Sequence, residues 1–133
     1  MVEQLITWGK DGNSIAIPQV QAYTYDEDDR VRAAVAIVFG KLIADQSLNN
    51  QVKQGIESLG ELQRDRAFWV RKLAVKSLGK IRSEAVIPYL KLAQKDADIE
   101  VVKIASEILQ NYKGYVANSP KELPKNSALK EQN

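Results

Sequence analysis

One stretch of twelve residues, beginning at Val31, recurs in the chain and constrains its fold more than any other feature. A second copy begins at Val70, and a looser third copy begins at Val101. We number the positions of each copy from its valine, which is position 0. On a helical wheel, with about 100° per residue, positions 0, 4, 8 and 11 share one side. They hold Val31, Val35, Phe39 and Leu42; Val70, Ala74, Leu78 and Ile81; and Val101, Ala105, Leu109 and Tyr112. Each copy is therefore predicted to be an amphipathic helix with one apolar side.

A second apolar pattern precedes each copy at a constant distance. An isoleucine lies at the same separation before each valine, and a valine or leucine follows that isoleucine three positions later: Ile17, Ile56 and Ile87, then Val20, Leu59 and Leu90. Three copies of helix, turn and helix in one register predict an all-α repeat array, a short solenoid of helix pairs. The expected pairs span about residues 14–43, 50–82 and 84–113, within a domain of residues 1–116.

The two ends of the chain carry weaker signals. Residues 2–8 are typical of a short helix, and the Gly9 that follows lies eight residues before Ile17, as Gly79 lies eight residues before Ile87. This spacing suggests a half repeat that caps the array, although Gln4 and Thr7 occupy positions that are apolar in the other copies. From residue 117 to residue 133, prolines and polar residues leave little to bury, so a disordered tail is expected there.

The composition removes several kinds of chemistry. The 133 residues include no cysteine and no histidine, and so no disulfide, thiol nucleophile, imidazole base or usual zinc ligand. A net charge of +2 does not by itself indicate binding to nucleic acid or membranes. No apolar run approaches the roughly 20 residues of a spanning helix, and no signal peptide is evident at the N-terminus. We therefore expect a cytoplasmic protein that is not an enzyme and has no metal or cofactor.

The acidic turn at residues 25–29 is expected to serve the helix that follows it. Asp28 and its counterpart Asp98 lie three residues before the repeated valine, where a carboxylate can cap a helix and face the positive end of its dipole. The alternating oxygen ligands and distal glutamate of a calcium loop are missing from this turn.

Short motifs recur at the helix ends. They are Ala16-Ile17-Pro18 and Val86-Ile87-Pro88, Asp26 with Val31-Arg32 and Asp65 with Val70-Arg71, and Phe39-Gly40-Lys41-Leu42 and Leu78-Gly79-Lys80-Ile81. These motifs resemble the HEAT-like repeats of phycobilisome lyases and of related cyanobacterial and archaeal proteins. The resemblance covers residues 14–112. It implies an α-α superhelix that acts as a scaffold, and it implies no particular activity.

The resemblance also implies a structural role for two sets of charged residues. Asp26 and Asp65 each lie six residues before an arginine, Arg32 and Arg71 respectively. In HEAT repeats, the resemblance implies, such residues form a ladder that links neighbouring turns. In the third copy, Asp96 is followed at the same spacing by a valine, so the ladder is expected to stop there.

The side of the repeated helices opposite their apolar side is a candidate binding surface. Positions −1, 2, 6 and 10 lie there and hold six cations and two anions in the three copies. Repeat arrays usually bind on the concave wall that the second helices form, and an aromatic residue within a patch is a typical anchor. The residues expected to contact a partner are Arg30, Ile37, Lys41, Trp69, Lys72, Lys76, Lys80 and Lys103. The alternative is a solvated polar face, on which lysine is common.

Three functions are consistent with this surface. The leading hypothesis is a non-catalytic scaffold that binds the acidic surface of another protein. The second is an accessory subunit or relative of a phycobilin lyase that binds a phycobiliprotein or a bilin, whose propionates can pair with lysines or Arg30. Nucleic-acid binding ranks last, because two acids interrupt the basic strip and one aromatic residue is available for stacking.

Overall fold

The computed structural model describes residues 1–12 and 14–117, and every regular element in that part of the chain is helical. The α-helices are α1 Val2–Asp11, α2 Ile17–Gln21, α3 Asp29–Ile43, α4 Asn50–Leu62, α5 Phe68–Leu78, α6 Ile87–Ala93 and α7 Ile99–Ala117. Short 3-10 turns, η1 Ser14–Ala16 and η2 Glu84–Val86, lead into α2 and α6. The predicted all-α fold is confirmed.

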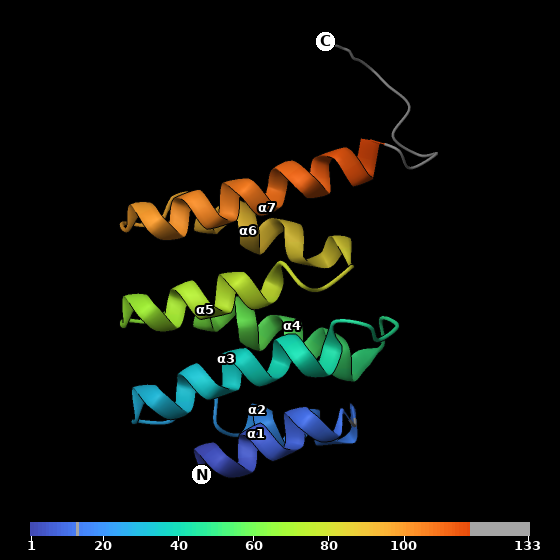
Figure 1. Ribbon diagram of the computed structural model, residues 1–133, viewed down its shortest axis with the longest axis vertical. Helices are drawn as coiled ribbons and strands as arrows, with labels where there is room; N and C mark the ends of the chain where they lie inside the picture. Colours follow the sequence, from blue (N-terminus) through green and yellow to red (C-terminus); the bar gives the residue numbers. More distant parts are fainter. Residues whose placement is uncertain (13, 118–133) are drawn as a thin grey trace.

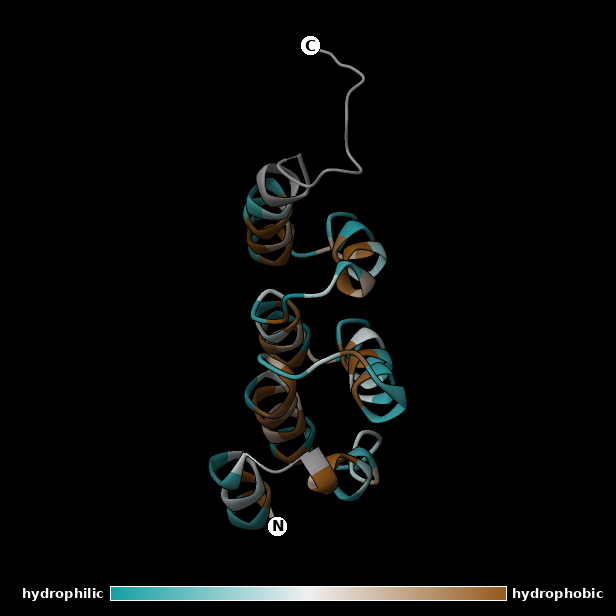
Figure 2. Ribbon diagram, turned by 90° about the vertical axis from the view of Figure 1, so that its right-hand side faces the viewer, coloured by the Kyte–Doolittle hydropathy of each residue, from teal (hydrophilic) through white to brown (hydrophobic). Residues whose placement is uncertain are grey.

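The helices form two rows, which Figures 1 and 2 show from two directions. The helices α1, α3, α5 and α7 lie side by side in one row, and α2, α4 and α6 form the other. We call α2, α4 and α6 the first helices, and α3, α5 and α7 the second helices. Each second helix packs on its own first helix and on its neighbours in the row. The result is the predicted solenoid of three helix pairs, preceded by α1.

The disordered tail predicted from the sequence begins at residue 117, which is the last residue of α7. Residues 118–133 lie outside the described part of the chain.

Side-chain caps set the starts of several helices. The carboxylate of Asp28 accepts a hydrogen bond from the backbone N–H of Arg30 at 2.9 Å, and that of Asp98 accepts one from Glu100 at 2.8 Å. Asn49 caps α4 in the same manner, through the N–H of Val52 at 2.8 Å. These bonds satisfy N–H groups that have no partner inside the helix. Both aspartates act as the sequence analysis predicted.

The core lies between the two rows. Positions 0, 4, 8 and 11 are buried throughout α3 and the α5 repeat, and at positions 0 and 4 of α7. Leu109 and Tyr112, at positions 8 and 11 of α7, are only partly buried. The reason is that α3 and α5 also contact the first helix of the following pair, whereas no first helix follows α7 in the described chain.

Glycine at position 9 allows neighbouring helices of the long row to approach closely. A Cβ at this position would press on the residue at position 7 of the next helix. The nearest contacts of such a Cβ would be Gly9 with Val38 at 3.4 Å, Gly40 with Ser77 at 2.7 Å and Gly79 with Ile108 at 2.5 Å. Because Gly9 meets α3 as the other two glycines meet α5 and α7, α1 is a half repeat in the common register.

This register explains the polar residues of α1. Gln4 lies at position 4, which in the other copies packs on a first helix, and Thr7 lies at position 7, which packs on the preceding glycine. In the described chain no helix precedes α1, and both side chains are exposed. Their polarity is therefore consistent with a half repeat in the common register.

Candidate functional site

The residues predicted to bind a partner lie on one side of the long row. We call the side of α1, α3, α5 and α7 opposite their buried positions the long-helix face. Of the eight predicted residues, Lys72 is half-buried and the other seven are exposed: Arg30, Ile37, Lys41, Trp69, Lys76, Lys80 and Lys103. The helical register therefore brings them to a common surface, although the contacts they make there differ.

Lys72 is engaged within the molecule. Its Nζ lies 2.8 Å from Oε1 of Glu100 on α7 and 6.0 Å from the ring centroid of Phe68. The hydrogen bond from Lys72 is the main reason that the pKa of Glu100 is lowered. Lys72 thus joins α5 to α7, and its charge is largely offset by a neighbour before any partner arrives.

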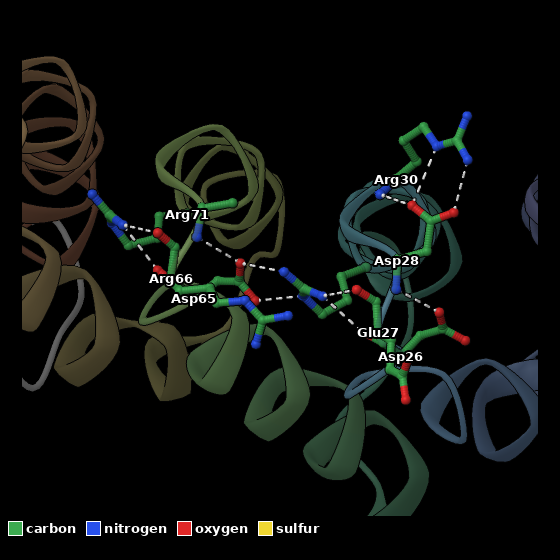
Figure 3. Close-up of polar contacts among 9 residues, drawn as sticks. Asp26, Glu27, Asp28, Arg30, Asp65, Arg66 and Arg71 are labelled. Atoms are coloured by element: carbon green, nitrogen blue, oxygen red, sulfur yellow. Dashed lines mark hydrogen bonds and ion pairs between the residues drawn. The ribbon is translucent and has the colours of Figure 1, made fainter.

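Arg30 is also paired, within its own helix start. Its Nε and Nη2 donate hydrogen bonds to the two carboxylate oxygens of Asp28, at 3.2 and 3.0 Å, as Figure 3 shows. These bonds lower the pKa of Asp28 and raise that of Arg30. The pair is exposed, so water and salt screen it and it adds little to stability.

Five cations of the long-helix face form no ion pair with another described residue. They are Lys10, Lys41, Lys76, Lys80 and Lys103, and all five are exposed. Glu107 is an anion on the same face that also forms no ion pair with a described residue. Two of the five cations, Lys76 and Lys80, belong to α5 and the turn after it, while Lys10, Lys41 and Lys103 lie on α1, α3 and α7.

Large apolar side chains are exposed on the same face. Trp69 and Ile37 each keep 38% of their surface accessible, and Ile6 of α1 keeps 42%. Ile6 and Ile37 occupy position 6 of adjacent helices. The sequence analysis missed Ile6 because α1 lacks the repeated valine from which positions were counted. The distance to Gly9 supplies the missing register.

The charged ladder runs between consecutive repeats (Figure 3). Arg32 donates to Asp65 from Nε at 2.7 Å and from Nη2 at 3.1 Å. Arg71 donates in the same way to Asp96, at 2.9 and 3.3 Å. Asp26 takes part differently: its backbone carbonyl accepts from Arg32 Nη1 at 2.7 Å, and its carboxylate accepts from the N–H of Asp28 at 2.9 Å.

The ladder also includes Asp96, where the sequence analysis expected it to stop. Asp96 receives Arg71 although its own repeat has no arginine to continue the series. The position of that arginine holds Val102, so the ladder ends at the third turn. A spacing of six residues within one repeat could not show this, because each arginine reaches an aspartate in the following repeat.

An open cavity lies where the ends of α5 and α7 meet. It has a volume of about 370 Å³ and is lined by Gly79, Lys80, Arg82, Asn111 and Tyr112. Two cations at its rim make it the continuation of the lysine strip toward the C-terminal ends of these helices.

The described residues contain no group of three or more acidic side chains arranged to hold a metal ion. None of the described helices is long and apolar enough to cross a membrane. In comparisons with known proteins, the family model of HEAT repeats matches residues 17–110. A search of curated proteins finds no match to the chain.

Proposed function

The chain belongs to the HEAT repeat family, and from this premise we propose that it is a non-catalytic scaffold that binds an acidic protein surface on its long-helix face. HEAT repeats commonly serve as scaffolds for protein–protein interaction. The observation that carries the proposal is the exposure of Trp69 on the same face as Lys76 and Lys80, which form no ion pair with a described residue. A face with an exposed aromatic side chain and unpaired cations has both an apolar anchor and a means to attract an acidic partner.

The packing around Trp69 supports its role as an anchor. The bond from Lys72 to Glu100 links position 2 of one helix to position −1 of the next. Ala33 and Trp69 occupy the same two positions in α3 and α5, and Ala33 is only 4% exposed. By this equivalence we expect the indole to lie toward Ala33, and its 38% exposure means that the protein already covers part of the ring. A partly supported ring loses little conformational freedom when a partner covers it.

The free lysines support an electrostatic contribution to the approach of a partner. Lys76 lies on α5, Lys80 lies four residues later in the turn that follows it, and Lys103 lies on the adjacent α7. Because these amines are exposed, they act mainly through long-range attraction, which salt weakens. The partner is therefore expected to carry carboxylates and to associate faster at low ionic strength.

The test begins with the recovery of partners from the native host by pull-down and mass spectrometry. Association and dissociation rates are then measured for the wild type, Trp69→Ala and a triple variant with Lys76, Lys80 and Lys103 changed to glutamate. The triple variant should associate more slowly and lose its salt dependence, whereas Trp69→Ala should mainly dissociate faster.

The matched control reverses three exposed lysines of the other row: Lys53, Lys91 and Lys95. The control has the same net charge as the triple variant, so only the position of the charges differs. Equal binding by the two reversed variants would mean that the lysines of the long-helix face are solvated surface and that the proposal is wrong.

A second candidate function is binding to a phycobiliprotein or a bilin. It is supported by the cavity at the ends of α5 and α7, where Lys80 and Arg82 can pair with the two propionates of such a pigment. Co-expression with bilin synthesis tests it. Pigment absorbance that copurifies with the wild type and is lost with Lys80→Glu and Arg82→Glu would favour it over the first proposal.

A further inference from the structure

The long-helix face changes character along the array. Position 6 holds Ile6 on α1, Ile37 on α3, Lys76 on α5 and Glu107 on α7, and all four side chains are exposed. The first two helices therefore present aliphatic side chains where the next two present charged ones. At position 2, α1 and α3 carry Val2 and the buried Ala33, whereas α5 and α7 carry lysines.

The helices of the long row share one register, so equal positions on them correspond. The close approach of Gly9 to Val38 repeats the approach of Gly40 to Ser77, so equal positions on α1, α3 and α5 are aligned across the row. Ile6 and Ile37 thus lie side by side at the spacing of adjacent packed helices, about 8–10 Å.

We infer that the partner contributes an amphipathic helix that lies along the row, with apolar side chains over α1 and α3 and carboxylates over α5. This inference rests on the proposed scaffold function and adds the form and the direction of the bound segment. Aliphatic side chains at position 6 of α1 and α3, followed by Lys76 at position 6 of α5, are what select this occupant. Lys10 and Lys41 add cations at position 10 of the aliphatic half.

The spacing of the apolar side chains favours a helix over a strand. In a helix, residues seven apart lie on one side and about 10.5 Å from each other, close to the separation of two packed helices. In a strand, residues on one side are about 6.6 or about 13 Å apart, and residues three apart point to opposite sides. A helical segment can therefore contact Ile6 and Ile37 with one face, and a strand fits them poorly.

The charges locate the acidic half of the segment over α5 rather than over α7. Lys76 on α5 and Lys80 in the turn after it form no ion pair with a described residue, whereas Lys72 already binds Glu100 and leaves less charge for a partner. On α7, Glu107 would repel a carboxylate placed at position 6. The acidic residues of the partner helix are thus expected about 14 residues from the apolar side chain that contacts α1. At about 1.5 Å per residue, this length equals the two helix spacings between α1 and α5.

The test uses synthetic helical peptides of about 20 residues, long enough to cross the row at about 1.5 Å per residue. One peptide has leucines in one half of a face and glutamates in the other half. The control peptide has the same composition with leucines and glutamates interleaved along the face. The first peptide should bind at least about tenfold more tightly, and equal affinity for the two peptides would overturn the inference.

The direction of binding is read by crosslinking. The chain has no cysteine, so a photocrosslinker can be attached at one site in Lys10→Cys on α1 or in Asn111→Cys on α7. Both residues are exposed and occupy position 10. Mass spectrometry should locate the crosslink from α1 in the leucine half and that from α7 in the glutamate half. The opposite order, or no preference, would contradict the inference.

Two substitutions test the apolar half. Ile6→Ser and Ile37→Ser should each weaken binding of the peptide by about tenfold, a typical cost for a central apolar anchor. Leu92→Ser, an exposed leucine of α6 in the other row, is the matched control and should have no effect. Equal losses at Leu92 and at the two isoleucines would overturn the inference.

The two proposals fail in different ways. If reversal of Lys76, Lys80 and Lys103 abolishes binding of the native partner but the peptides bind without preferred direction, the inference about the segment is wrong and the scaffold function stands. If that reversal affects neither the native partner nor the peptides, both proposals are wrong.

Discussion

Arg32 of α3 forms a two-bond ion pair with Asp65 of the next repeat, and its Nη1 donates to the backbone carbonyls of Asp26 and Glu27 at 2.7 and 3.1 Å. The side chains of Arg32 and Asp65 are only 5% and 9% exposed. The hydrogen bond to Asp65 raises the pKa of Arg32, so its charge is retained despite burial. One guanidinium thus connects the turn of its own repeat to that of the following repeat.

Removal of this guanidinium should destabilise the array. Arg32→Ala leaves the carboxylate of Asp65 buried without its counter-charge, which typically costs about 3–5 kcal/mol. Arg71→Ala should cost less, because the Arg71 side chain is 17% exposed and water can reach the vacated site. Urea denaturation measures both. Binding of the partner at the long-helix face should persist under conditions in which the variants remain folded. Normal stability together with lost binding would make the arginines site residues instead.

The predicted rotation of α5 can be tested by two substitutions on the same helix. Leu78 is fully buried and Lys76 is exposed. Leu78→Ala should lower the free energy of unfolding by about 2–5 kcal/mol, because it removes buried apolar surface and leaves a cavity. Lys76→Ser should change it by less than about 0.5 kcal/mol, as is usual for surface positions. Similar losses in thermal or chemical denaturation would contradict the assigned orientation of the helix.

Gly40 of α3 and Gly79 at the end of α5, both at position 9, should differ in how much stability is lost when each is changed to alanine. An added Cβ at Gly40 would lie 2.7 Å from Ser77 Oγ, and that hydroxyl is held by a hydrogen bond of 2.7 Å to the carbonyl of Ala36. Gly40→Ala should therefore destabilise the protein by about 1–3 kcal/mol through overpacking. At Gly79 the three nearest atoms all belong to the half-buried side chain of Ile108, at 2.5, 2.9 and 3.3 Å, and no hydrogen bond holds that side chain in place. Gly79→Ala should therefore destabilise the protein less than Gly40→Ala does.

A double substitution checks the cause of the Gly40 effect. Ser77→Gly in the Gly40→Ala background removes the side chain that the new methyl group would strike. If overpacking is the cause, part of the lost stability should return, relative to Ser77→Gly alone. Additive losses in chemical denaturation would mean that Gly40 matters for another reason.

The ion pair between Lys72 and Glu100 predicts how stability depends on pH. The pKa of Glu100 in the folded state is lower than that of an ordinary glutamate, chiefly because Lys72 donates a hydrogen bond to it. A carboxylate with a lowered pKa stabilises the folded state above its unfolded-state pKa, and this contribution is lost as the pH falls through the folded-state value. The contribution of Glu100 should therefore be constant near neutral pH and should decline only below about pH 4.5.

Glu100→Gln isolates this contribution. The variant should show a smaller loss of stability than the wild type between about pH 4.5 and pH 2, because one shifted carboxylate has been removed. The exposed Glu107→Gln is the control, since no described cation pairs with it. Denaturation curves of the wild type and Glu100→Gln that run parallel throughout this pH range would contradict the prediction.

The sequence alone determined the helices and their order. Amphipathic periodicity and capping are local properties, so the valines at position 0 and the aspartates three residues before them predicted both the buried sides and the helix starts. The distance between Gly9 and Ile17 suggested the half repeat. The family resemblance added the idea of a charged ladder through Asp26, Arg32, Asp65 and Arg71 that stops at Asp96, and it did not indicate that Asp96 receives Arg71.

Only the tertiary structure decided what the charged and apolar residues of the face contact. It pairs Lys72 with Glu100, buries Ala33, aligns Ile6 with Ile37 and sends Arg71 to Asp96. These relations connect side chains of different helices, and they depend on how closely the helices approach and in what register. That geometry follows from glycine at position 9 and from the packing of both rows together, and no periodicity within a single helix contains it.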